Sequence, residues 1–274
     1  MRQYQELLED VLTLGHLRNT RSGPVFSIFD RRLEFYMVDG FPAVTTKKLQ
    51  FKSVAAELAG FLQAERRASK MGSSIWEADA RRWYNTPGSN SMDPDDLGQV
   101  YGVQWREAWN WRDEEPVDQL QAVVDLLKTD PYSRRLFVSA WNPGDLDYMC
   151  LPPCHTHFQF YVNKEDHLDL KFYMRSVDCF LGLPFNIAGY GLLLHIIAAQ
   201  TSFRPGRLVA DLGDCHVYSN HVRQVDELLS REPLPLPILR MNPDTTIDNF
   251  TVESVHLAHY KHYPAIKAPL NVGE

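Results

Sequence analysis

A candidate nucleophile lies in the segment LPPCHTHF (151–158), where Cys154 follows two prolines. The prolines fix the backbone ahead of the cysteine, and His155 and His157 come directly after it. A cysteine reacts as the thiolate, which a nearby cation or hydrogen-bond donor favours by lowering the pKa of the thiol. Taken alone, a structural cysteine buried in a tight turn is the stronger interpretation, because free cysteine is a common core residue.

Four arginines lie in polar segments that suit a phosphate group: Arg21 in NTRSG, Arg134 and Arg135 in DPYSRRL, and Arg175 in YMRSVD. The planar guanidinium group binds phosphate through two parallel hydrogen bonds, and Ser176 adds a hydroxyl donor. For any single arginine, ordinary surface charge is the alternative. The adjacent pair at the start of a predicted strand is more suggestive of binding.

Three further side chains suit a nucleoside. Asn186 in GLPFNIAG (182–189) offers one acceptor and a pair of donors that match O4 and N3–H of uracil, and helix capping is the alternative. His216 and Tyr218 alternate, so both lie on one face of a predicted strand, where they can bind sugar hydroxyls. A half-buried strand with polar tips is the alternative there. The histidine spacing does not complete a tetrahedral metal site, so no metal is expected.

Hydrophobic periodicity predicts the elements that position these residues. Helices are predicted at 1–19, 51–62 and 117–128, and an almost wholly apolar run predicts a central buried helix at 186–201. Strands are predicted at 134–141, 157–163 and 168–176, with strand character in 25–44 around an Asp39-Gly40 turn and in 245–265. Residues 64–98 are poorly patterned and include a polar loop at 84–96. Without a linker or an internal repeat, one α+β domain is the simplest arrangement.

Charge and cysteine content exclude several classes of protein. The net charge of −7 and the absence of a basic run argue against a nucleic-acid-binding surface. The four cysteines have no CxxC spacing, and neither a signal peptide nor 18 consecutive apolar residues is present. We therefore expect free thiols, a cytoplasmic location and no membrane association.

Taken together, the motifs closely resemble the thymidylate synthase superfamily. The resemblance runs in order through TTKK (45–48), AELAGFLQ (56–63), IW (75–76), DLGQVYGVQWR (96–106), DPYSRRLFVSAWNPGDLD (130–147), LPPCH (151–155), RSVDCFLGLPFN (175–186), HVYSNH (216–221), LSREPLPLP (229–237) and IKAP (266–269). It implies one catalytic domain over 1–274, a large mixed β-sheet packed against helices, and a homodimer formed through the sheet.

The same resemblance implies a reaction and a role for each matching residue. Cys154 adds to C6 of a pyrimidine nucleotide, and C5 then attacks 5,10-methylenetetrahydrofolate. The implied catalytic residues are Cys154, Glu57, Tyr101 and Asp178. The implied nucleotide-binding residues are Arg21, Arg175, Ser176, Asn186, His216 and Tyr218, with Arg134 and Arg135 contributed by the neighbouring subunit. The implied folate-binding residues are Trp76, Leu151, Asp178, Gly182 and Phe185.

Departures from the synthase pattern cluster on the folate side. Asp79 stands where synthases usually carry a second tryptophan, Met174 replaces a glutamine and Leu212 replaces a glycine. Residues 63–74 lack the usual glycine and Thr-Asn, and the C-terminus is about two residues longer, ending in 273–274. Gly189 and Gly191, just past the base-reading position, replace slightly larger residues. These changes favour a hydroxymethylase, in which water completes the reaction, over a synthase, in which hydride from folate does so.

Substrate and class have their own alternatives. Cytosine-specific relatives carry aspartate at the position of Asn186, so dUMP is favoured over dCMP. A nucleotide- or RNA-binding regulator without activity is a rival interpretation, as is a flavin-dependent enzyme. The retained Cys154, Glu57 and Tyr101 argue against the former, and the absence of a Gly-rich dinucleotide loop argues against flavin. A hydroxymethylated base would suit a virus with modified DNA, which makes a virus-encoded enzyme one interpretation of the source.

Overall fold

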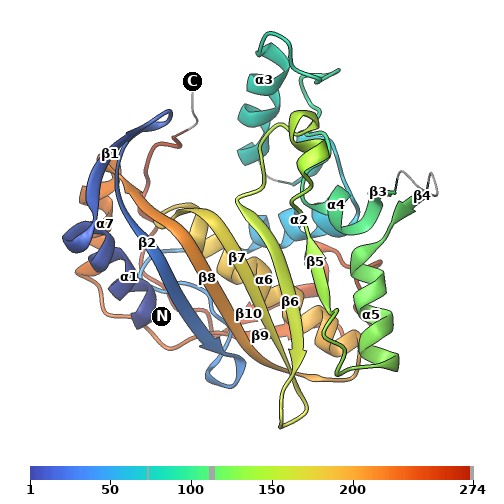
Figure 1. Ribbon diagram of the computed structural model, residues 1–274. Coiled ribbons are helices and arrows are strands. Elements are labelled where there is room, and N and C mark those ends of the chain that lie inside the picture. Colours follow the sequence, from blue (N-terminus) through green and yellow to red (C-terminus); the bar gives the residue numbers. More distant parts are fainter. Residues whose placement is uncertain (73, 111–114, 272–274) are drawn as a thin grey trace.

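A six-stranded sheet with strand order β1-β2-β8-β7-β6-β5 organises the fold (Figure 1). The strands are β1 (His16–Thr20), β2 (Gly23–Tyr36), β5 (Phe137–Ser139), β6 (His155–Val162), β7 (His167–Asp178) and β8 (Arg204–Tyr218). β7 and β8 are parallel and the other neighbouring pairs in this sheet are antiparallel, so the sheet is mixed. The computed structural model describes residues 1–72, 74–110 and 115–271.

Helix α6 (Gly182–Gln200) connects the two parallel strands and packs on one face of the sheet beside α2 (Phe51–Leu62) (Figure 1). Parallel neighbours cannot be joined by a tight turn, so a crossover helix is required. By length and composition α6 would be able to cross a membrane, but 67% of its most apolar stretch is buried inside the protein. It is therefore the core helix of the domain.

Shorter elements surround this core. The remaining helices are α1 (Arg2–Leu14), α3 (Glu77–Asn85), α4 (Gly102–Glu107), α5 (Gln119–Thr129) and α7 (Val222–Leu229). Two small hairpins are formed by β3 (Ala108–Asn110) with β4 (Glu115–Val117) and by β9 (Ile238–Met241) with β10 (Val255–Ala258). Single 3-10 turns occupy Met37–Asp39, Ala68–Lys70, Ser74–Trp76, Pro143–Tyr148, Ser219–His221 and Val252–Ser254.

The face of the sheet opposite α6 carries a row of aromatic side chains. Side chains alternate along a strand, and the fully buried Phe158 and Phe172 point toward α6. On the other face, the ring of His157 stacks between Phe137 and Tyr173, with centroid distances of 5.1 and 5.4 Å. Phe137 is 44% exposed, so the chain leaves this aromatic row partly open to solvent.

Most of the predicted elements are confirmed. The helix predicted at 51–62 is α2, and the helix predicted at 117–128 is α5, which begins after the N-cap Asp118. The strands predicted at 157–163 and 168–176 correspond to β6 and β7. One α+β domain with a mixed sheet and a central buried helix is also confirmed.

Several predicted boundaries are wrong. The first helix ends at Leu14 instead of residue 19, because residues 16–20 pair with β2 as an edge strand. The strand predicted over 25–44 ends at Tyr36, and the one predicted over 134–141 retains only residues 137–139. The two strand predictions extended alternating polarity beyond the residues that have a pairing partner, whereas the helix prediction continued into residues that pair as a strand.

Two errors concern the functional region. Helix α3 was missed because it is charged and buries only Ala80 and Trp83, which leaves little apolar periodicity to detect. Helix α6 begins at Gly182 and not at Asn186, so the capping alternative for Asn186 is wrong. Asp178 instead accepts backbone hydrogen bonds from residues 180 and 181, both at 3.0 Å, just before the helix.

Candidate active site

An open cavity of ≈ 1030 Å³ lies where the parallel strands β7 and β8 end. The carboxyl ends of parallel strands are a common place for ligand sites in sheets with crossover helices. Many residues singled out from the sequence line this cavity: Arg21, Glu57, Trp76, Leu151, Cys154, Arg175, Ser176, Asp178, His216 and Tyr218. Tertiary folding thus brings together segments that are nearly 200 residues apart in the sequence.

Cys154 is held on the cavity wall by backbone and side-chain contacts directly before β6. The Arg175 guanidinium donates to the carbonyl oxygens of Pro152 and Pro153, each at 2.9 Å, and the Arg175 N–H donates to the Cys154 carbonyl at 2.9 Å. The Cys154 N–H donates to the Tyr101 hydroxyl oxygen at 2.8 Å. Arg175 on β7 therefore anchors the loop through three carbonyl oxygens, which fixes the position of Cys154 on the cavity wall.

The environment of Cys154 sets its charge. Burial raises the pKa of the thiol above its usual value of 9.0, while Arg175 and a hydrogen bond from Tyr101 lower it, and the nearby Asp79 and Asp178 raise it. The raised pKa keeps the thiol protonated before a ligand binds. A proton acceptor must therefore be part of any nucleophilic step.

Neither neighbouring histidine supplies a cation to Cys154. Burial lowers the pKa of His155 to about 3, and its Nδ1 lies 2.7 Å from the Tyr190 hydroxyl. The His155 ring also stacks on Tyr101 at a centroid distance of 4.1 Å. His157 points to the opposite face of the sheet, where burial also lowers its pKa. Arg175 is therefore the cation that acts on the thiol.

Tyr101 is positioned by strained backbone. It is only 2% exposed and has a φ of +26°, a left-handed conformation that is unfavourable for a side chain of this size. The next residue, Gly102, has no room for a side chain, since a Cβ there would lie 2.2 Å from the Phe61 carbonyl oxygen. Strain of this kind persists where surrounding packing fixes a functional side chain.

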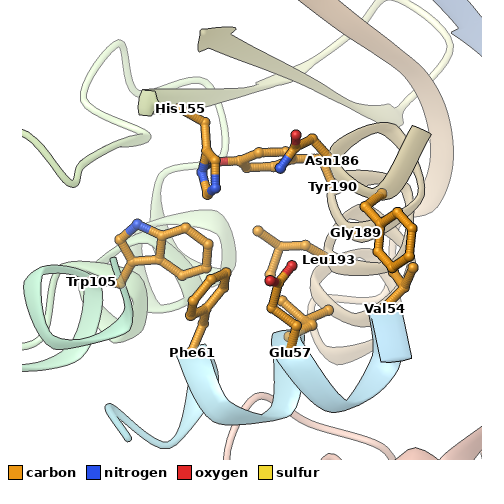
Figure 2. Close-up of a pocket in the computed structure, with 11 residues that line it drawn as sticks. Val54, Glu57, Phe61, Trp105, His155, Asn186, Gly189, Tyr190 and Leu193 are labelled. Atoms are coloured by element: carbon orange, nitrogen blue, oxygen red, sulfur yellow. Dashed lines mark hydrogen bonds between the residues drawn. The ribbon is translucent and has the colours of Figure 1, made fainter. Parts of the chain in front are cut away.

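Glu57 extends from α2 into the space between the helices and the sheet (Figure 2). Burial raises the pKa of its carboxyl from 4.5 to about 7, and a hydrogen bond from Trp76 Nε1 at 2.9 Å partly opposes this rise. Glu57 lines the large cavity and also a smaller one. A carboxyl that titrates near neutrality can take up and return protons during a reaction.

The smaller cavity lies behind Glu57 and has a volume of ≈ 300 Å³ (Figure 2). Asn186 and Phe185 from the start of α6 line it, together with His155 and Gly189. Within the described part of the chain, the Asn186 amide makes no side-chain hydrogen bond, which leaves its donors and its acceptor available. A Cβ at Gly182 would lie 3.8 Å from the Asn186 amide oxygen, so Gly182 is close to this group as well.

One edge of the large cavity is polar. Asp178 on β7 pairs in register with His216 on β8, and Tyr218 follows two residues later on the same face. Asp214 supports His216: His216 Nδ1 lies 3.3 Å from the Asp214 carbonyl oxygen and 3.5 Å from the carboxylate Oδ1. The hydrogen bond with His216 and those with Arg18 and a serine hold the pKa of Asp214 well below its usual range. No pattern in the sequence had indicated Asp214 as a supporting carboxylate.

Further residues line the large cavity. Arg82 is a lining residue that no sequence pattern indicated, whereas Asp79 and the C-terminal segment with Leu270 and Asn271 were noted as departures from the synthase pattern. Asn271 exchanges hydrogen bonds with Asn220 at 3.0 and 3.2 Å, so the end of the described chain borders the site. The predicted role of residues 273–274 in displacing the terminal carboxylate lies outside the described residues.

Arg134 and Arg135 do not reach this cavity. Both are exposed in the turn before β5, and Arg134 lines a separate surface pocket with residues of β6. The cavity of one chain therefore contains two of the four predicted phosphate arginines, Arg21 and Arg175. Over the ranges 1–72, 74–110 and 115–271, no cluster of three or more histidine, cysteine or acidic residues is arranged to hold a metal ion.

A family model described as thymidylate synthase matches residues 2–272. The match covers nearly the whole chain, and the chain therefore belongs to the thymidylate synthase family. It is a folate-dependent enzyme that transfers a one-carbon unit to C5 of a pyrimidine nucleotide. The predicted family and enzyme class are thereby confirmed.

Proposed function

We propose that this member of the thymidylate synthase family converts dUMP to 5-hydroxymethyl-dUMP, with water as the final nucleophile. The supporting observation is the polar wall formed by Asp79 and Arg82 in the large cavity, where their side chains pair at 2.7 Å. The resemblance places a second tryptophan of the synthases at the position of Asp79. An ion pair there favours water, whereas an aromatic ring would exclude it.

The proposed reaction begins with the uracil ring beside Cys154. The thiolate adds to C6, and the electron pair of the C5–C6 bond moves to make C5 nucleophilic. The Tyr101 hydroxyl and Arg175 stabilise the thiolate, because both lower the pKa of Cys154. Glu57, with a pKa of about 7, exchanges protons with the ring through water.

The nucleotide is proposed to bind along the polar edge of the cavity. Arg21, Arg175 and Ser176 hold the phosphate, since they line one cavity and offer charge-assisted hydrogen bonds. His216 and Tyr218 bind the ribose hydroxyl from the same face of β8.

Asn186 is proposed to select uracil. Its amide has both an acceptor for N3–H and donors for O4, and no protein group in the described chain occupies them. Cytosine presents a donor in place of O4, which fits an aspartate better than an amide. We therefore propose dUMP, and not dCMP, as the substrate.

The cavity also suits the folate. Trp76 and Leu151 provide apolar surface, and Asp178, fixed by two backbone hydrogen bonds, provides a carboxylate acceptor for ring N–H groups. Phe185, which lines the smaller cavity, and Gly182, at the start of α6, are proposed to complete the folate site. The folate supplies the methylene group, and these residues would hold it against the nucleotide. C5 bonds to the methylene carbon, the C–N bond to the folate breaks to release tetrahydrofolate, and loss of the C5 proton leaves an exocyclic methylene group on C5.

We further propose a homodimer formed through the open face of the sheet, with the whole chain acting as one catalytic domain. The aromatic row of Phe137, His157 and Tyr173 gives that face an apolar surface suited to burial against a second copy. Arg134 and Arg135 are exposed beside β5 and away from their own cavity, which supports a role in the partner's phosphate site.

The test is to incubate the protein with methylenetetrahydrofolate and either dUMP or dCMP, and to identify the nucleotide by mass and the folate by absorbance. We expect 5-hydroxymethyl-dUMP with tetrahydrofolate. Dihydrofolate formed in step with turnover would show a true synthase instead, and preference for dCMP would refute the assignment of Asn186. The Cys154→Ser variant is expected to bind dUMP but to release no tritium from C5-labelled dUMP.

A further inference from the structure

An ion pair inside the large cavity takes no part in the addition of Cys154 to the pyrimidine ring. Asp79 lies in the first turn of α3, and its carboxylate Oδ1 pairs with the Arg82 guanidinium one turn later at 2.7 Å. The two side chains are only 16% and 23% exposed. Most ion pairs along a helix face solvent, whereas this one faces the cavity that contains Cys154.

The position of Asp79 relates it to the reacting groups. Trp76 precedes it by three residues, and the indole N–H of Trp76 donates to Glu57 at 2.9 Å. The charge of Asp79 also contributes to the raised pKa of Cys154, so the carboxylate is close enough to act on the thiol electrostatically. Two carboxyl groups, Glu57 and Asp79, therefore line the same cavity together with Trp76.

The two carboxyl groups have different surroundings. Glu57 is buried, its one side-chain hydrogen-bond donor among the described residues is the neutral indole N–H of Trp76, and it stays protonated up to a pH of about 7. Burial raises the pKa of Asp79 above its usual value, and the cations Arg82, which is paired with it, and Arg21 oppose this rise. Of the two, only Asp79 has cationic partners within the described chain, and two carboxyl groups with such different surroundings at one site can divide the roles of acid and base.

We propose that Asp79 is the catalytic base that takes the proton of the attacking water, and that Arg82 positions its carboxylate. The inference rests on the proposed hydroxymethylation. The water oxygen forms a bond to the exocyclic methylene carbon at C5, and one water O–H bond breaks, with its proton passing to Asp79. The electron pair of the exocyclic double bond moves to form C5=C6, and the C6–S bond breaks to release the thiolate of Cys154.

This assignment gives Asp79 a role that only the last step needs. Addition of Cys154 and loss of the C5 proton precede the attack by water and do not require a second base at this position. A base that activates a nucleophile typically contributes at least about 10²-fold to a rate. A loss of that size confined to the last step therefore distinguishes Asp79 from a residue that only supports the fold.

The experiment compares Asp79→Asn with the wild-type protein and with a matched control, Glu77→Gln. Glu77 is on the same helix and pairs with Arg81 at 3.6 Å on the exposed side. Each protein is assayed for tritium release from C5-labelled dUMP and for 5-hydroxymethyl-dUMP, with and without an added small thiol that captures the methylene intermediate as a thioether.

For Asp79→Asn we expect tritium release within a few-fold of wild type, hydroxymethyl product lowered by about 10²-fold or more, and thioether in its place. The control is expected to match wild type in all three readouts. Equal losses of tritium release and product, or unchanged product, would overturn the role of Asp79. If Asp79→Asn fails to fold, the Asp79→Glu variant is used, and it must retain tritium release and recover product at raised pH. Wild-type protein that makes dTMP would instead refute the proposed function itself.

Discussion

Replacement of Glu57 by glutamine is expected to stabilise the protein at alkaline pH while impairing catalysis. Burial raises the pKa of Glu57 from 4.5 to about 7. Each tenfold change in an ionisation equilibrium is worth about 1.36 kcal/mol, so this rise corresponds to ~3 kcal/mol of unfavourable burial of the charged carboxylate. Glutamine has nearly the same shape and keeps an acceptor for Trp76 Nε1 without ever becoming charged.

The direction of the pH effect follows from the raised pKa. The stabilisation that Glu57 gains as a protonated group is complete below its unfolded pKa of 4.5 and is lost as the pH rises through about 7. The stability advantage of Glu57→Gln should therefore grow from about 1 kcal/mol at pH 5 to about 3 kcal/mol at pH 8. The same substitution removes the proton carrier and should slow C5 tritium release by about 10²-fold or more.

Urea unfolding followed by tryptophan fluorescence at pH 5 and pH 8, at one protein concentration, measures this difference. The control is Glu77→Gln, since the Glu77 side chain is 44% exposed and should change stability by less than about 0.5 kcal/mol at either pH. An advantage of Glu57→Gln that is the same at both pH values, or that is larger at pH 5, would refute the reasoning.

Two further predictions concern helix α6 and the dimer. Gly189→Ala should raise the melting temperature, because the helix propensity of alanine is better by about 1 kcal/mol and the new Cβ would meet a single atom, at 3.9 Å. Gly191→Ala should raise the melting temperature less, because its Cβ would meet the ring of Pro42 at 3.1 Å. Calorimetry of both variants checks this ranking, and equal gains would contradict the packing argument. Mixing inactive Cys154→Ser with an inactive Arg134→Ala, Arg135→Ala variant should restore about a quarter of wild-type turnover through hybrid dimers. A mixture that stays inactive after subunit exchange would exclude a shared site.

Much of the framework could be predicted from the sequence because it depends on local patterns. The spacing of apolar residues located α2 and α5, and alternation located β6 and β7. Helix α3 escaped detection because its residues face solvent and the cavity more than a core. Asp79 and Arg82 are among the polar residues of this helix, and both line the cavity. The helix that the sequence did not predict therefore carries a central part of the proposed chemistry.

The sequence by itself determined the family, and it singled out Cys154 as the candidate nucleophile, since order and spacing along the chain are enough to identify both. Only the tertiary structure decided which groups act on Cys154: Arg175 is the nearby cation and His155 is neutral. It also decided that Glu57 titrates near neutrality while Asp214 does not. The physical reason is that a pKa depends on burial and on charges brought close by folding, and neither is encoded in the neighbouring residues of the chain.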